Sequence, residues 1–143
     1  MPLSSRHFQW VSEMRWLVLM VAMTTSAAAQ VCHEGSADIF HMTEWSAEQS
    51  GDHVTKVTIV YTNESPKTVD MVDATAWFDD ALGDNIGGIR LDRDPQVAPD
   101  GSVTSTHNMA GFQRLTKAKP DNISAYICVR SVLYDDGTKE EFN

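Results

Sequence analysis

The amino-acid sequence predicts an all-β domain, an antiparallel sandwich of about seven strands, that follows a removable N-terminal signal peptide. Three observations predict this class. Several segments alternate apolar and polar residues with a period of two, turn-forming clusters such as Asn-Glu-Ser-Pro and Asp-Asp-Gly separate them, and no strand alternates with a long helical pattern. Parallel α/β folds are therefore excluded.

Two central strands are predicted by regular alternation. In Val54–Tyr61, the residues Val57, Ile59 and Tyr61 alternate with Thr58, Val60 and Thr62. Thr68–Phe78 alternates as well, and one face carries only apolar residues: Val72, Ala74, Ala76 and Phe78. The other face carries Met71, Asp73, Thr75 and Trp77.

The remaining elements are shorter or less regular. The first strand, expected at Ile39–Trp45, has an alternative, because Ile39, Phe40, Thr43 and Ala47 also fit a helical stripe. One helical turn is expected at Phe112–Lys117, ended by Pro120. Further strands are expected at Asn85–Leu91, Ser102–His107, Ile123–Val132 and Lys139–Phe142, separated by loops at 79–84, 92–101 and 135–137.

Residues 1–29 have the three parts of a signal peptide. Arg6 and Arg15 supply positive charge, the run Trp16–Met23 is apolar, and Ser26–Ala29 offers small residues for cleavage, so Gln30 is expected to be the first mature residue. The apolar run is far shorter than the roughly 20 residues that span a bilayer, so we expect no permanent membrane helix. A buried N-terminal helix is the alternative, and Met14 is an alternative translation start. Residues 30–143 then form one domain, with 114 residues and a core of its own.

The charge balance excludes some partners. The chain has a net charge of −9, and removing residues 1–29 leaves nine basic and 19 acidic residues, or −10. Such a surface repels phosphate backbones and anionic membranes, and no Lys/Arg cluster offsets it locally. We therefore expect no nucleic-acid partner.

Two cysteines, Cys32 and Cys128, remain after export. In an oxidising compartment, an even pair predicts a disulfide bridge, which would tie the mature N-terminus to the strand Ile123–Val132. The alternatives are two free thiols, or Cys32-His33 as half of a metal site. Val31 precedes Cys32 where a bacterial lipid-anchor motif has Gly or Ala, so no lipid anchor is expected.

The run Tyr126-Ile127-Cys128 resembles the F-strand signature of immunoglobulin domains, in which a tyrosine two residues before the second cysteine closes a corner. The resemblance places Trp77 at the strand-C position. The preceding strand, Val54–Tyr61, has no cysteine, so the usual inter-sheet bridge cannot form and any bridge must start from Cys32.

A second resemblance covers Val57 to Val132. The series Val57-x-Ile59-x-Tyr61-Thr62-Asn63-x-Ser65, Val69-x-x-Val72-x-Ala74, Phe78-x-Asp80-x-x-Gly83-x-x-Ile86 and Val97-x-Pro99-x-Gly101-x-Val103 is similar to FxLYD-type and water-stress (late-embryogenesis-abundant) Ig-like domains. The resemblance implies an Ig-like sandwich, and a non-enzymatic extracytoplasmic module without assigned functional residues.

The chemistry of the residues offers two candidate metal sites. His41-Met42 and His107-Asn108-Met109 pair imidazole with thioether, a ligand set that suits Cu(I). An acidic set in the loops would suit Ca²⁺ if it gathered at one end of the sandwich, although it lacks EF-hand spacing: Asp79, Asp80, Asp84, Asp92 and Asp94. Both sets are also explained as ordinary surface and core residues, and we expect no cofactor.

No catalytic constellation is visible, because the chain lacks Gly-x-Ser-x-Gly and a Gly-rich phosphate loop. The sequence therefore predicts a soluble periplasmic or secreted Ig-like module that is not an enzyme. It would bind or scaffold a protein or envelope partner through a sheet edge or end loops. A metal-binding protein, with copper on His/Met or calcium on the Asp loops, is the alternative.

Overall fold

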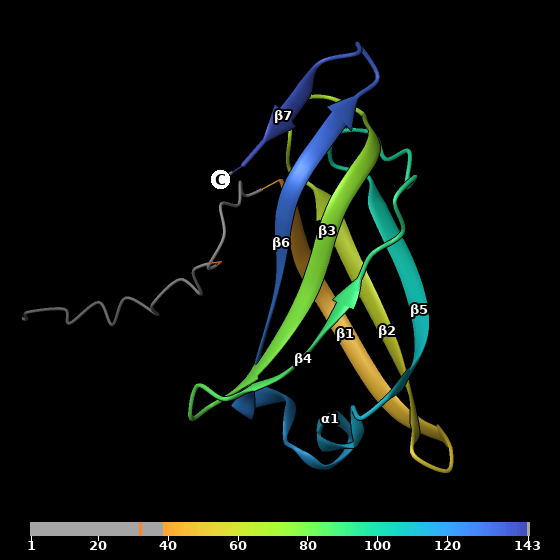
Figure 1. Ribbon diagram of the computed structural model, residues 1–143, viewed down its shortest axis with the longest axis vertical. Helices are drawn as coiled ribbons and strands as arrows, with labels where there is room; N and C mark the ends of the chain where they lie inside the picture. The colour runs from red at the N-terminus through yellow and green to blue at the C-terminus, as the bar shows by residue number, and fades with distance from the viewer. Residues whose placement is uncertain (1–31, 33–38, 143) are drawn as a thin grey trace, which may run out of the picture.

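Seven strands build two antiparallel sheets that face each other in the computed structural model of the chain (Figure 1). The structure describes Cys32 and residues 39–142. The strands are β1 (Phe40–Gly51), β2 (Val54–Asn63), β3 (Val69–Asp80), β4 (Asn85–Arg90), β5 (Ser102–Ala110), β6 (Ile123–Tyr134) and β7 (Lys139–Glu141). The predicted all-β sandwich of seven strands is confirmed. The expected signal peptide, residues 1–29, lies outside the described residues.

The strand order makes the sandwich Ig-like. One sheet has three strands in the order β1-β2-β5, and the other has four in the order β4-β3-β6-β7. Every pair is antiparallel, and the chain crosses between the sheets after β2, after β4 and after β5. Such crossings pair strands that are distant in sequence, β2 with β5 and β3 with β6, as in immunoglobulin-type sandwiches.

The core lies between the sheets and is filled by alternate residues of the central strands. In β2 every second residue is buried, from Thr55 to Asn63. In β3 the four apolar residues predicted to share a face are all buried, and the opposite set faces outward, so both faces were predicted correctly. Phe78 is fully buried, and its ring makes edge contacts with Trp45 at 5.5 Å and Phe112 at 6.5 Å between centroids.

The first segment is a strand, and the helical alternative for it is wrong. Strand β1 pairs with β2 along most of its length, although the register shifts between Met42 and Glu44. Because of this bulge, the residues that pack on the core are spaced by two, three and two positions: Phe40, Met42, Trp45 and Ala47. The three-residue step across the bulge imitates helical spacing.

A buried asparagine holds the loops at one end of the sandwich. Asn63 is fully buried, and its Nδ2 donates to the carbonyl oxygens of Lys67 at 2.9 Å and Val97 at 3.0 Å. Its Oδ1 accepts from the backbone N–H and the hydroxyl of Ser65 at 2.9 and 2.7 Å. The four bonds satisfy both the N–H₂ group and the carbonyl oxygen of the buried Asn63 amide.

The expected helical turn closes the other end (Figure 1). The helix α1 (Gln113–Lys117) and a 3-10 turn, η1 (Pro120–Asn122), connect β5 to β6, and they bury Phe112 and Leu115. Among the described residues, no helix has the length and apolar character that crossing a bilayer requires.

Candidate functional site

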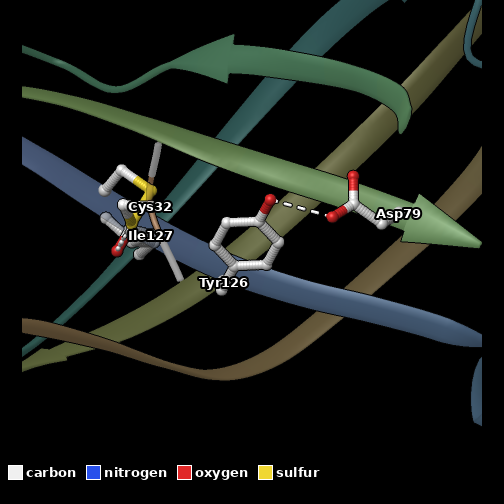
Figure 2. The surroundings of a disulfide bond; sticks show 5 residues. Cys32, Asp79, Tyr126 and Ile127 are labelled. Atoms are coloured by element: carbon white, nitrogen blue, oxygen red, sulfur yellow. Dashed lines mark hydrogen bonds between the residues drawn. A yellow bond between two sulfur atoms is a disulfide. The ribbon is translucent and has the colours of Figure 1, made fainter. Parts of the chain in front are cut away.

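Cys32 and Cys128 form a disulfide, as the sequence predicted. Their Cα atoms are 5.8 Å apart, within the range of about 4.4–6.8 Å that an unstrained bridge allows. Neither thiol is left free for nucleophilic chemistry or for a Cys32-His33 metal site. Figure 2 shows the bridge lying against β6 beside the carbonyl of Ile127, which is 3.9 Å from the Cys32 sulfur.

The bridge lies on the outer face of the four-stranded sheet, and this corrects the F-strand interpretation. Ile127 and Val129 of β6 are buried in the core, so Tyr126 and Cys128 point the other way. The Tyr126 hydroxyl donates to Oδ2 of Asp79 on β3 at 2.8 Å (Figure 2), where the immunoglobulin corner bonds upstream backbone. Trp77 also faces outward, so it does not pack beside a core disulfide.

The outer face of this sheet has an aromatic centre. Trp77 on β3 pairs in register with Tyr126 on β6 and with Gly88 on β4. The Trp77 ring lies directly over Gly88, where an added Cβ would come within 2.6 Å of Cζ3. Glycine at this position therefore lets the indole lie flat along the sheet.

A hollow of about 510 Å³ opens on this face, a size typical of small-ligand sites. We call it the outer-face hollow. Its described lining comes from β3, β6, the β3–β4 turn and the disulfide: Cys32, Asp73, Thr75, Trp77, Asp79, Gly83, Asn85, Tyr126, Cys128 and Arg130.

Polar groups at one end of the hollow are fixed by hydrogen bonds. Asp79 is only 8% exposed, and its carboxylate accepts from Tyr126 and, at 2.7 Å, from Asn85 Nδ2. Burial, the hydrogen bond to Asp79 and the charge of that carboxylate together raise the pKa of Tyr126 to about 12, and burial has the largest effect. The phenol is thus neutral at physiological pH and remains a donor.

Charged groups flank the other end. Asp73 accepts from Arg90 at 2.9 Å, so its charge is balanced along the sheet surface. Arg130 is exposed at the rim. A group bound in the hollow could stack on the aromatic rings. It could also form hydrogen bonds with the amide, the two carboxylates and the guanidinium.

The proposed copper ligands are not brought together. His41 pairs with Thr62 and is exposed on the outer face of the three-stranded sheet. His107 pairs with the buried Val57, so it faces inward, and its Nε2 lies 3.1 Å from the Ser105 hydroxyl. Met42 and Met109 pack against the core. The two histidines are therefore on opposite faces of one sheet.

The five aspartates do not gather at one end either. Asp79, Asp80 and Asp84 surround the β3–β4 turn, whereas Asp92 and Asp94 follow the opposite end of β4. Asp80 accepts from Arg114 Nη2 at 2.6 Å, and this bond lowers the pKa of the carboxyl. Within the part of the chain that the structure describes, no group of three or more His, Cys, Asp or Glu side chains is placed to hold a metal ion.

Alternation in the sequence places Trp77 on one face with Asp73 and Thr75, but it does not show that this face meets Tyr126 and Cys128 of β6. Asp79 and Asn85 were missed as partners of Tyr126. The alternation that includes Trp77 continues to Asp79, and this pattern could have indicated that Asp79 lies on the same face as Trp77. Comparisons with protein families, with curated proteins and with solved structures gave no match.

Proposed function

We propose that this chain is an exported, non-enzymatic Ig-like binding module, periplasmic or secreted, which recognises a protein or envelope partner through the outer-face hollow. The observation that carries the proposal is the assembly of Trp77, Tyr126 and Asp79 on one outward-facing sheet surface. A hollow lined by two aromatic rings and a buried carboxylate is typical of binding sites and is unusual on a sheet face that contacts only water.

The outer face of the other sheet provides the contrast. Its outward-facing residues on β2 and β5 are mostly small and hydroxyl-bearing, and none is aromatic: Lys56, Thr58, Val60, Thr62, Ser102, Thr104, Thr106 and Asn108. Tyrosine and tryptophan are the side chains that most often anchor binding surfaces, because they supply large contact areas with few rotatable bonds. The asymmetry between the two faces supports the four-stranded sheet as the binding face.

Export is supported by the disulfide and by residues 1–29. Bridges persist in oxidising compartments, and the leader has the composition of a cleavable signal. The resemblance to FxLYD-type and water-stress domains supports the same placement. The net charge of −9 argues against a nucleic-acid partner.

The binding proposal is tested by NMR on the processed chain, which retains only two tryptophans, Trp45 and Trp77. Trp45→Phe assigns the two indole N–H resonances. The chain is titrated with soluble envelope extract and, separately, with isolated cell-wall polysaccharide from the source cells. We expect the Trp77 indole and the Tyr126 and Cys128 amides to shift.

The matched variants are Trp77→Ala and Thr58→Ala, one on each outer face. Losing the indole should weaken the interaction by at least about fivefold, since aromatic anchors commonly contribute more than about 1 kcal/mol. Thr58→Ala should leave it unchanged. Shifts confined to the three-stranded sheet, or equal effects of the two variants, would contradict the proposal. Retention of residues 1–29 in the mature protein, read by mass spectrometry, would contradict export.

A further inference from the structure

Four strands lie at sheet edges, and three of them carry features that discourage pairing with another chain. Edge strands expose unpaired N–H and C=O groups, which proteins usually protect with charge, irregularity or brevity. Strand β7 has three residues, all charged. Strand β4 has six residues, including two adjacent glycines and Arg90. Strand β1 is broken by two register shifts and bears Glu44 and Glu48.

Strand β5 has none of these features. Its nine residues, Ser102–Ala110, pair with β2 in unbroken register and include no charged residue, proline or glycine. Within the described part of the chain, its backbone hydrogen bonds all go to β2. Alternate residues of an antiparallel strand direct their N–H and C=O groups away from the neighbour, so about half of those of β5 are open. Figure 1 shows β5 as the border of its sheet.

The side chains of β5 are suited to a further strand on both faces. On the outer face, hydroxyl pairs already bridge β2 and β5: Thr58 and Thr106 oxygens are 3.3 Å apart, and Thr62 and Ser102 oxygens are 3.2 Å apart. On the inner face, Val103 and Met109 pack on the core but are only partly buried. A neighbouring strand would continue the hydroxyl ladder and cover the half-buried row.

We propose that β5 pairs with β5 of a second copy of this chain about a two-fold axis, which joins two three-stranded sheets into one of six strands. In an antiparallel pairing centred on Thr106, this residue faces Thr106 of the partner subunit, and Thr104 faces Asn108 of the partner subunit. No charged side chain then meets its own copy. A pairing of β7 centred on its middle residue would instead set Glu140 against its own copy, and a pairing of β1 centred on Ser46 would set Glu44 against Glu48, in a chain of net charge −9.

The pairing edge lies in the sheet that does not carry the outer-face hollow, so this inference is independent of the proposed function. It predicts a weak dimer, because one strand pair makes a small interface. Sedimentation of the processed chain between about 10 µM and 1 mM should show a monomer–dimer equilibrium.

Two substitutions that add the same charge distinguish a role of the β5 edge from a role of the rest of the sheet. Thr106→Lys places a charge at the two-fold axis and should weaken dimerisation by more than about tenfold. Thr58→Lys adds the same charge to the same face, one strand further in, because Thr58 is the register partner of Thr106. This control should still dimerise. A monomer at all these concentrations, or a dimer affected equally by both changes, would overturn the proposal.

Amide hydrogen exchange of the unmodified chain gives a second readout that needs no variant. Raising the protein concentration should slow exchange at alternate β5 amides and leave β1, β4 and β7 unchanged. If β5 amides became protected only on adding envelope extract, and not with protein concentration, the edge would take a different chain and the second-copy assignment would be wrong.

Discussion

Removing the Cys32–Cys128 bridge should lower the free energy of unfolding while leaving the fold in place. The bridge joins residues 96 positions apart. In the chain-entropy description, closing a loop of this length destabilises the unfolded chain by about 4.7 kcal/mol at 25 °C, and natural bridges contribute about 2–4 kcal/mol. In a domain of this size, 1 kcal/mol shifts Tm by about 4 °C, so we expect Tm to fall by roughly 8–16 °C.

The fold should survive because the bridge is not part of the core. Cys128 faces outward, whereas its neighbours Ile127 and Val129 fill the interior. Thermal unfolding followed by circular dichroism, with and without reductant, measures the effect. The double variant Cys32→Ser/Cys128→Ser should have the Tm of the reduced protein, and adding reductant should leave that Tm unchanged. Oxidised and reduced midpoints within about 2 °C would refute the entropic argument, and loss of the β spectrum at 25 °C would refute the self-sufficient core.

Three further perturbations test particular contacts. Asn63→Ala removes four hydrogen bonds of a fully buried amide and should cost about 3 kcal/mol or more in urea unfolding, while the exposed Asn122→Ala should stay within about 0.5 kcal/mol. Gly88→Ala pushes a Cβ to 2.6 Å from the Trp77 ring and should cost roughly 1–3 kcal/mol in thermal unfolding, whereas Gly51→Ala, with its nearest neighbour at 3.8 Å, should cost nothing. The pKa of each of the three tyrosines is raised to about 12, mainly by burial, whereas the value in the unfolded chain is near 10. The contribution of these tyrosines to the free energy of unfolding is therefore complete below pH 10, and it is lost as the pH rises through about 12. Ultraviolet absorbance should therefore show tyrosinate only as the chain unfolds, and its appearance near pH 10 in folded protein would contradict the burial of these phenols: Tyr61, Tyr126 and Tyr134.

Period-two alternation was enough to predict the faces of the central strands. In β3 the apolar and polar sets are distinct, so inside and outside could be assigned from the sequence. In β6 the two sets are less distinct, with the apolar Ile127 and Val129 on one face and Tyr126 and Cys128 on the other. The orientation of β6 therefore stayed open, because alternation fixes which residues share a face but not which face is buried.

The candidate site could be predicted only in part, because it depends on pairing between strands that are distant in the sequence. The parity of the two cysteines predicted their bridge, since no other thiol was available. The bond between Tyr126 and Asp79 joins residues 47 positions apart, and it depends on the register of β6 on β3. One sequence carries no record of that register. The bulge in β1 was hidden for a similar reason, because it exists only through pairing with β2.

The most direct test of the outer-face hollow as the binding face is site-specific photo-crosslinking in the source cells. A photoreactive phenylalanine replaces Arg130 at the rim of the hollow in one strain, and Lys56 on the outer face of the three-stranded sheet in another. Each change removes one positive charge, so the two strains are matched. The account predicts a crosslinked adduct of discrete mass from position 130 and none from position 56. An adduct from position 56 alone, or no adduct from position 130, would contradict it.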